Sequence, residues 1–384
     1  MKSIGLFLIV IAFSLIFAVM CSAEQKQVAP LAIGAAAPDF NLPAVDGRNY
    51  RLADFADYNI LVIVFTANHC PTAQAYEDRI MKLASDYKNK SVALVAISPN
   101  DPLSVRLDEM GYTDLGDSFE EMKMRADERH FNFPYLYDGQ TQRVSLAYGP
   151  VSTPHVFIFD KDRKLQYTGA IDNDENPGKV KKSFVRDAID ALLEGREVAL
   201  KKTKTFGCSI KWADKRKSAE KAFADWAKEP VEVNLIDANG IRTLMKNDSP
   251  SAVSSGPNGG KLRLVNVWAT WCGPCVIEMP ELVNINRMYR GRPFEMITIS
   301  SDTLNKKDDV LKFLKDKQVS CRNYQYSGDD KTELGETVDK NWEGGIPYTV
   351  IVEPNGEILY RHTGPIDPLE VKKVIIGYLG RYYF

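Results

Sequence analysis

The stretch Trp268-Ala269-Thr270-Trp271-Cys272-Gly273-Pro274-Cys275 follows an apolar run over residues 262–267 and precedes a helix-like segment over residues 276–289. A Cys-x-x-Cys pair at such a strand-to-helix junction brings two sulfurs within disulfide distance on the first helical turn. The positive end of the helix dipole stabilises a thiolate on the first cysteine, and that thiolate is a nucleophile. The stretch therefore predicts thiol–disulfide exchange chemistry.

The two cysteines are predicted to have different roles. We expect Cys272 to be the exposed attacking thiol and Cys275 to be the more buried resolving thiol. Pro274 lies in the first turn, where its missing N–H costs nothing. A purely structural disulfide is the alternative, whereas a zinc site would need a second pair of ligands at suitable spacing, and the sequence shows none.

The N-terminus indicates export. Met1-Lys2, an apolar run over residues 4–20 and the exit Cys21-Ser22-Ala23 follow the secretory signal pattern. Two alternatives stay open, namely a lipoprotein signal that is acylated at Cys21 and a retained signal anchor. We expect a signal peptide over residues 1–23 and a protein of the periplasm or cell envelope, either soluble or lipid-anchored at Cys21.

Composition excludes several classes of protein. The chain has 384 residues with 44% hydrophobic content, which is enough for about two ordinary domains. Its net charge is −2 and no basic block stands out, so nothing points to nucleic acid. The cysteines other than Cys21 are too few for a disulfide scaffold, and their odd number leaves at least one thiol without a partner in the chain.

The chain also contains a diverged internal repeat. Residues 61–66 lead into 67–71 as residues 262–267 lead into the Cys-x-x-Cys stretch, and residues 152–159 match 345–352. Both copies then reach Thr-Gly-x-Ile-Asp and a closing helical segment. This order of strands and helices predicts an α/β fold with two tandem thioredoxin-like domains, each a mixed sheet flanked by helices.

The repeat and the composition predict the domain boundaries. After the signal peptide we expect a first domain over residues 28–194, a basic linker over 195–229 and a second domain over 230–384. The linker contains a predicted helix over 213–226, and its basic residues are predicted to be a solvated surface.

The second copy resembles the TlpA/ResA-like thiol–disulfide oxidoreductases of the bacterial envelope. The resemblance rests on Trp268 to Cys275 and on Glu278-Met279-Pro280, and it implies a thioredoxin fold and reduction of disulfides outside the cytoplasm. It also implies that Pro347 is a cis-proline facing the dithiol. Glu278 matches the family's acidic residue, which either moves protons during exchange or merely complements the helix dipole. Trp271, Gly273 and Pro274 are expected to support the site.

The first copy resembles the AhpC/TSA-type redoxins, which often carry Cys-Asn-His-Cys-Pro after a strand. Asn68-His69-Cys70-Pro71, Thr153-Pro154-His155 and the segment 207–212 fit that pattern. One position departs from it, because Ala67 stands where the first cysteine is expected. By the internal alignment, Ala67 replaces the nucleophile and Cys70 occupies the resolving position. The peroxidase arrangement Pro-x-x-x-Thr-x-x-Cys is absent too, because Ile63 and Ala67 occupy its Pro and Thr positions.

Three interpretations of the first domain stay open. It is a degenerate domain kept for packing or partner recognition, or Cys70 pairs with Cys208 as a second redox centre, or His69, Cys70 and His155 bind a soft metal such as copper. The lone Cys321 is interpreted as a free, half-buried thiol.

The sequence as a whole predicts an exported reductant of protein disulfides that works through Cys272 and Cys275 by a mixed-disulfide mechanism. Its redox group is the Cys272–Cys275 disulfide, with Cys70 and Cys208 as a candidate second pair, and no cofactor and no resident metal are expected. The expected partners are disulfide-containing proteins and, from the resemblance, a membrane-bound thiol electron donor. The alternative is a metal-handling or partner-binding protein in which the dithiol is auxiliary. Neither the substrate nor the oligomeric state follows from the sequence.

Overall fold

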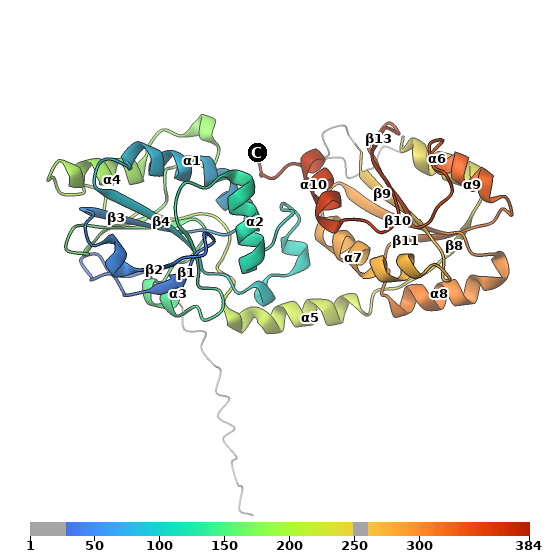
Figure 1. The fold of residues 1–384 in the computed structure, drawn as a ribbon, viewed down its shortest axis with the longest axis horizontal. Helices are drawn as coiled ribbons and strands as arrows, with labels where there is room; N and C mark the ends of the chain where they lie inside the picture. Colours follow the sequence, from blue (N-terminus) through green and yellow to red (C-terminus); the bar gives the residue numbers. More distant parts are fainter. Residues whose placement is uncertain (1–27, 249–259) are drawn as a thin grey trace, which may run out of the picture.

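The computed structural model describes residues 28–248 and 260–384, which form two α/β domains side by side (Figure 1). The expected signal peptide, with Cys21, lies outside the described residues. No helix within the described ranges is long and apolar enough to cross a membrane.

The first domain is built on a five-stranded sheet in the order β5-β4-β3-β6-β7. Strands β3, β4 and β5 are parallel, whereas β6 is antiparallel to β3 and β7 is antiparallel to β6. The strands of this domain, including a separate hairpin of β1 and β2, are β1 Asn41–Pro43, β2 Asn49–Arg51, β3 Ile60–Phe65, β4 Val92–Ser98, β5 Tyr135–Tyr137, β6 His155–Phe159 and β7 Leu165–Gly169. Its helices are α1 Pro71–Tyr87, α2 Phe119–Arg129, α3 Arg143–Tyr148 and α4 Phe184–Leu193.

The second domain has a six-stranded sheet in the order β13-β12-β9-β10-β11-β8. Its central strands β9 and β10 are fully parallel, and β12 runs antiparallel to β9. The strands are β8 Asn234–Ile236, β9 Leu262–Trp268, β10 Phe294–Ser300, β11 Arg322–Tyr326, β12 Tyr348–Val352 and β13 Ile358–Thr363. The helices are α6 Ala238–Lys246, α7 Gly273–Tyr289, α8 Lys307–Asp316, α9 Lys331–Val338 and α10 Pro368–Leu379.

Both sheets are covered on their two faces, so their central strands are apolar throughout. In the second domain, α7 and α10 cover one face and α6 and α9 cover the other. In the first, α1 and α4 cover one face, and the hairpin with α3 covers the other. Strands buried on both faces read as continuous hydrophobic runs, which is why β3 and β9 are recognisable in the sequence. The predicted pair of thioredoxin-like domains is confirmed.

The segment expected to be a basic linker belongs in large part to the first domain. Val198 and Ile210 are 3% and 1% exposed. The Thr168 N–H donates to the Lys201 carbonyl at 3.0 Å, so the chain continues along the edge of β7. The isolated apolar residues cover the first domain while the lysines between them face solvent. The connection itself is α5, Arg216–Trp226, with a short turn of 3₁₀-helix before it (Figure 1).

The two domains also touch directly, between α7 and the loop of the first domain around residues 105–117. Met110 of that loop lies in the second domain's core cluster. The Tyr289 hydroxyl donates to the Thr113 carbonyl at 2.7 Å. At the C-terminus, Arg381 forms two hydrogen bonds with the buried Asp114 carboxylate, at 2.6 and 2.8 Å. The helix that carries the Cys-x-x-Cys pair is thereby fixed against the first domain.

Candidate active site

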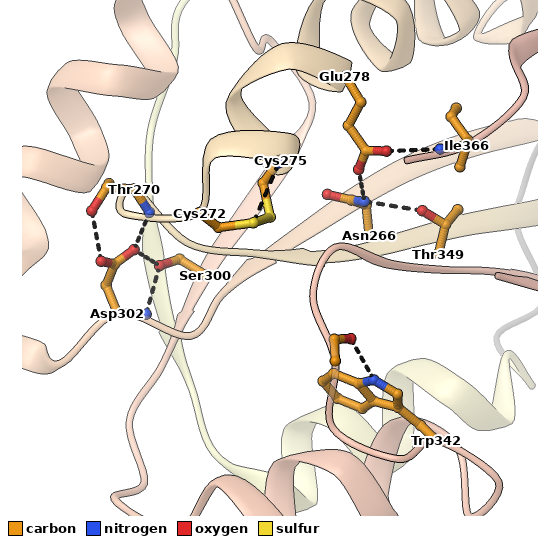
Figure 2. The surroundings of a disulfide bond; sticks show 11 residues. Asn266, Thr270, Cys272, Cys275, Glu278, Ser300, Asp302, Trp342, Thr349 and Ile366 are labelled. Atoms are coloured by element: carbon orange, nitrogen blue, oxygen red, sulfur yellow. Dashed lines mark hydrogen bonds between the residues drawn. A yellow bond between two sulfur atoms is a disulfide. The ribbon is translucent and has the colours of Figure 1, made fainter. Parts of the chain in front are cut away.

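A disulfide lies at the junction of β9 and α7 (Figure 2). Cys272 is the N-cap of α7, and it is bonded to Cys275 with 5.3 Å between their Cα atoms. The Cys275 N–H points to the Cys272 sulfur at 3.3 Å, and Pro274 fills a first-turn position that needs no donor. Cys272 is 5% exposed and Cys275 is fully buried, so solvent reaches the sulfur at the helix terminus, where the dipole favours a thiolate.

Asp302 holds the loop in front of the disulfide, and the sequence analysis missed it. Its carboxylate accepts the Thr270 N–H at 2.9 Å, the Thr270 hydroxyl at 2.7 Å and the Ser300 hydroxyl at 2.8 Å (Figure 2). Asp302 follows β10, the parallel neighbour of β9, so both strands end at the same edge of the sheet. The sequence feature that could have revealed Asp302 is its position, an acidic residue directly after the strand that neighbours β9.

The surroundings of the disulfide are apolar and open. Trp271 is 71% exposed and Ile277 is 77% exposed. Ile346 packs against the cluster that contains both cysteines, and the peptide bond between Ile346 and Pro347 is cis, as the resemblance implied. Among the described residues, the backbone N–H and C=O of Ile346 make no hydrogen bond. The surface beside Cys272 therefore combines exposed apolar side chains with the unpaired backbone N–H and C=O of Ile346.

Glu278 is buried in the second turn of α7, and its carboxylate contacts β9 and the segment just before α10. One carboxylate oxygen accepts from the Asn266 side chain at 2.9 Å, and the other accepts from the Ile366 N–H at 3.0 Å (Figure 2). Burial raises the pKa of Glu278, and these two hydrogen bonds oppose the rise. The carboxyl group is thus held one turn below Cys275 in surroundings that favour its protonated form.

Strand pairing within each domain shows which residues of the two domains are equivalent. The equivalent pairs beside the two prolines are Phe65 with His155 and Val267 with Tyr348. Counted along the chain from those strand positions, Cys70 and Cys272 are equivalent. Each is the N-cap of a helix of 17 residues, α1 or α7.

This register corrects the alignment made from the sequence. The Cys70 sulfur accepts the Ala73 N–H at 3.4 Å, as the Cys272 sulfur faces the Cys275 N–H. Cys70 therefore stands in the place of Cys272, and Ala73 stands in the place of Cys275. The expectation that Ala67 replaces the nucleophile was wrong, because it matched the motif by cysteine spacing, whereas the sheet and the helix cap fix the position.

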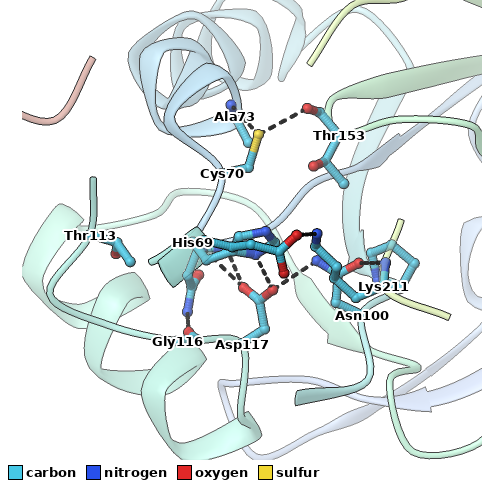
Figure 3. Close-up of polar contacts among 12 residues, drawn as sticks. His69, Cys70, Ala73, Asn100, Thr113, Gly116, Asp117, Thr153 and Lys211 are labelled. Carbon is cyan, nitrogen blue, oxygen red and sulfur yellow. Dashed lines mark hydrogen bonds and ion pairs between the residues drawn. The ribbon is translucent and has the colours of Figure 1, made fainter. Parts of the chain in front are cut away.

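A buried ion pair lies directly before Cys70 (Figure 3). The His69 Nδ1 is 2.5 Å from the Asp117 carboxylate, which also accepts the N–H groups of Asn68 and His69 at 2.8 and 3.1 Å. Asn100 donates to the same carboxylate at 2.7 Å. Burial alone would lower the pKa of His69, but the charge of Asp117 and its hydrogen bond raise it overall. A positive charge is thus held beside the Cys70 sulfur.

The structure brings Cys208 to Cys70. Both are free thiols, and Cys208 packs against the small cluster of Ala67, Cys70 and Ala73. Cys70 is fully buried, whereas Cys208 is half-buried between exposed neighbours. Of the candidates in the first domain, these two sulfurs are therefore in contact.

His155, the third metal candidate, lies apart from this arrangement. Its Nδ1 accepts the Val151 N–H at 3.2 Å and its Nε2 is 2.9 Å from the Thr168 hydroxyl. Burial, with a contribution from the charge of Lys202, lowers the pKa of His155 to about 3. Within the residues that the structure describes, no group of three or more His, Cys, Asp or Glu side chains is arranged to hold a metal ion. Cys321 is a free, half-buried thiol beside Asn323.

The C-terminal tail of the second domain lies beside the Cys70 site. After the Arg381–Asp114 pair, the Tyr383 ring packs on Tyr112 with 4.8 Å between the ring centres. Burial, together with the nearby Cys208 and Cys70 pair, raises the pKa of Tyr383 to about 12. Arg381 also reaches the Gln74 side chain of α1 at 3.4 Å, so the tail lies over the start of the helix that Cys70 caps.

Comparison with known proteins finds two family models in tandem. The AhpC/TSA family model matches residues 33–168 and the Redoxin model matches residues 232–375. The thiol-disulfide oxidoreductase ResA of Oceanobacillus iheyensis is 29% identical over 118 residues, which is 31% of this chain and 57% of that protein. The thiol:disulfide interchange protein DsbE of Allochromatium vinosum is 30% identical over 125 residues, covering 32% of this chain and 64% of that protein.

Among solved structures, an uncharacterized conserved protein from Geobacillus kaustophilus is 41% identical. The match covers 47% of this chain and 92% of that protein, with a TM-score of 0.42.

Proposed function

The chain belongs to the thioredoxin-like thiol–disulfide oxidoreductases, with an AhpC/TSA domain followed by a Redoxin domain, and from this we propose that it is an exported reductant of protein disulfides. The observation that carries the proposal is the Cys272–Cys275 disulfide at the N-terminus of α7. The Cys272 sulfur lies beside exposed apolar side chains and the unpaired backbone of Ile346.

In the proposed cycle, the reduced form carries a thiolate on Cys272 that the helix terminus stabilises. This thiolate attacks one sulfur of a substrate disulfide, forms a mixed disulfide and releases the other substrate sulfur as a thiolate, which takes up a proton. Cys275 then loses its proton, attacks the Cys272 sulfur and releases the second substrate sulfur. The substrate gains two electrons and two protons, and Cys272 and Cys275 end as the disulfide.

Protein substrates fit the surface better than small ones do. Trp271, directly before Cys272, and Ile277, in the second turn of α7, are exposed apolar side chains, and exposed aromatic side chains anchor protein interfaces. The unpaired N–H and C=O of Ile346 offer a place where an extended substrate segment can add backbone hydrogen bonds.

Glu278 is proposed to accept and return the proton of Cys275. A carboxyl group with a raised pKa exchanges protons nearer neutral pH than an ordinary one does, which suits a thiol that ionises once in each cycle. Its bonds to Asn266 and Ile366, rather than to the first-turn N–H groups of α7, support this role over simple complementation of the dipole.

The proposed location is the periplasm or cell envelope, supported by the signal-like N-terminus, with lipid attachment at Cys21 as the alternative to a soluble form. A reductant there needs electrons, and we assign their supply to a membrane-bound thiol donor. The Cys272–Cys275 disulfide serves as the redox group of this cycle, and no further cofactor enters it.

The direction of transfer is tested by equilibrating the mature protein with a series of dithiothreitol redox buffers and following Cys272–Cys275 by mass spectrometry after thiol trapping. The Gly-Pro dipeptide matches that of thioredoxin, so we expect a potential near about −270 mV. Reduction of insulin disulfides with dithiothreitol as electron source should accompany it. A potential near about −120 mV, the range of strong dithiol oxidants, would contradict the proposal.

A further inference from the structure

In the first domain, Cys208 pairs with Thr153, the residue directly before the cis-proline Pro154. The Thr153 N–H donates to the Cys208 carbonyl at 2.9 Å, forming an antiparallel bridge. Gly207 has φ +128°, and a Cβ there would lie 2.1 Å from the Thr153 carbonyl oxygen. Only glycine therefore lets the segment come this close.

The same bridge brings the two thiols together. The Cys70 thiol donates to the Thr153 carbonyl at 3.3 Å, so both cysteines bind one residue. Cys208 packs against the cluster that contains Cys70. Burial opposes ionisation of Cys70, but the neighbouring Cys208 thiol and the charge of His69 outweigh it and lower the pKa of Cys70 to about 6. The pKa of Cys208 is raised, because its proton is shared with the Cys70 sulfur and because it is partly buried.

In the described part of the second domain, the equivalent residue has no such backbone partner. Ile346 is the equivalent of Thr153, since each precedes its cis-proline, and Ile346 makes no backbone hydrogen bond among the described residues. Where the proposed function has an external substrate segment pairing with Ile346, the first domain has its own residues 207–208. Cys208 is then in the place of a substrate sulfur, opposite the helix N-cap thiol Cys70.

We propose that Cys70 and Cys208 are a second redox-active dithiol that exchanges with external disulfides through Cys208. The comparison with an external substrate rests on the proposed function, whereas the pairing of the two thiols does not. The acceptor is identified by class as a low-molecular-weight or protein disulfide that reaches the half-buried Cys208 sulfur.

The exchange balances without any other reactant. The Cys208 thiol loses its proton and attacks an external disulfide R–S–S–R, giving a Cys208–S–S–R mixed disulfide and one R–S⁻. The Cys70 thiolate then attacks the Cys208 sulfur, and the second R–S⁻ leaves. Because Cys70 is already ionised, the protein loses two electrons and one proton. The external disulfide gains the two electrons and becomes two thiolates, which take up that proton and one more from solvent. In the reverse direction, an external thiolate attacks the half-buried Cys208 sulfur, and Cys70 departs readily because its thiolate is stabilised.

The test uses the mature chain with Cys272→Ser and Cys275→Ser, which leaves Cys70, Cys208 and Cys321. The protein is equilibrated with reduced and oxidised glutathione at a series of ratios, quenched in acid, alkylated and digested for mass spectrometry. We expect a reversible Cys70–Cys208 cross-linked peptide, with Cys321, a matched half-buried thiol, alkylated throughout. Alkylation of both Cys70 and Cys208 after the most oxidising buffer, or equal pairing with Cys321, would overturn the proposal.

Two further variants guard against misfolding as an explanation. Adding Cys70→Ser to the same background should leave Cys208 carrying one glutathione, because nothing resolves the mixed disulfide. Gly207→Ala should lower the yield of the Cys70–Cys208 link at least tenfold with an unchanged circular dichroism spectrum. An unmodified Cys208 in the first variant, or an undiminished link in the second, counts against the mechanism.

The same series separates this inference from the proposed function. If Cys272–Cys275 reduces insulin while Cys70 and Cys208 never pair, only the second centre is refuted. If Cys70 and Cys208 pair while Cys272–Cys275 does not turn over, the second centre stands and the proposed function fails.

Discussion

Cys70 and Cys272 occupy the same place in two copies of one fold, but they face different partners. Each caps a helix of 17 residues that follows a buried strand, and each lies near a cis-proline segment. Cys272 is bonded to Cys275 and lies beside the unpaired backbone of Ile346, whereas Cys70 is covered by Cys208. The helix terminus supplies a thiolate in both, so the segment that crosses the proline decides whether the sulfur meets an external substrate or the chain itself.

The largest effect should come from removing one of the two capping sulfurs. Cys272→Ser should lower insulin reduction by at least about 10³-fold, because the serine hydroxyl is not ionised at neutral pH and cannot attack a disulfide. Cys70→Ser should leave at least half of that activity. Equal loss of insulin reduction in the two variants would show that Cys70 is as necessary as Cys272, which contradicts the assignment of this reaction to the second domain.

Glu278 is the next difference, because the equivalent position in α1 is Tyr76, a residue without a carboxyl group. Glu278→Gln should slow the reaction roughly 100-fold, as expected for the loss of a proton-transfer group. Rapid-mixing measurement of Cys272–Cys275 reduction by dithiothreitol, as a function of pH, checks this. Glu281→Gln, on an exposed position of the same helix, is the matched control and should change nothing.

The raised pKa of Glu278 also predicts how stability varies with pH. The native state binds this proton more tightly than the unfolded chain does, so wild-type stability falls as pH rises from the ordinary pKa of a glutamate through the raised one. Because Glu278→Gln lacks this penalty, its melting temperature relative to wild type should rise between pH 4 and pH 7. A difference in melting temperature that stays constant between pH 4 and pH 7 would contradict a raised pKa for Glu278 and its proposed role in proton transfer.

A smaller effect is expected from the open surface of the second domain. Trp271→Ala should raise KM for a protein disulfide about 10-fold, as for an exposed aromatic anchor, and should leave reduction of oxidised glutathione unchanged. Phe223→Ala, an exposed aromatic residue on α5 that is 42% accessible, serves as the control. Equal effects on large and small disulfides would argue against a protein-binding surface.

The smallest effect concerns the tail beside the first-domain site. Arg381→Ala leaves the Asp114 carboxylate, which is 0% exposed, without its partner, and this should cost about 3 kcal/mol in the free energy of unfolding. With the tail released, Cys208 should be alkylated severalfold faster in the background lacking Cys272 and Cys275. Arg242→Ala, which breaks an exposed pair with Glu333, should alter neither quantity.

Much of this fold is predictable from the sequence, because the central strands are buried on both faces. The apolar runs at residues 61–66 and 262–267 appear, within one residue at each end, as β3 Ile60–Phe65 and β9 Leu262–Trp268. Helix α7 was expected from residue 276, but it begins at Gly273, because Cys272 caps it and Pro274 fits its first turn. Helix boundaries set by caps are harder to predict than runs of apolar residues.

Contacts between residues far apart in the chain could not be predicted from the local sequence pattern. Residues 41–48 resemble 234–240, yet Asp46 lies in the β1–β2 hairpin, whereas the Asp237 carboxylate accepts the Gly240 N–H at 2.8 Å and starts α6. The contact of Cys208 with Cys70 depends on a β-bridge between residues 55 positions apart in the chain, Thr153 and Cys208. Asp302 and Asp117 likewise hold the two sites through contacts that no local motif records.

The most direct test of the central claim is to trap the mixed disulfide. Cys275→Ser and, separately, Cys208→Ser are each reduced, incubated with oxidised insulin and examined by mass spectrometry without reductant. The account predicts a covalent complex through Cys272 in Cys275→Ser, because the resolving thiol is gone, and normal turnover with no accumulated complex at Cys70 in Cys208→Ser. A complex through Cys70 or Cys208 in place of Cys272, or none in either variant, would contradict it.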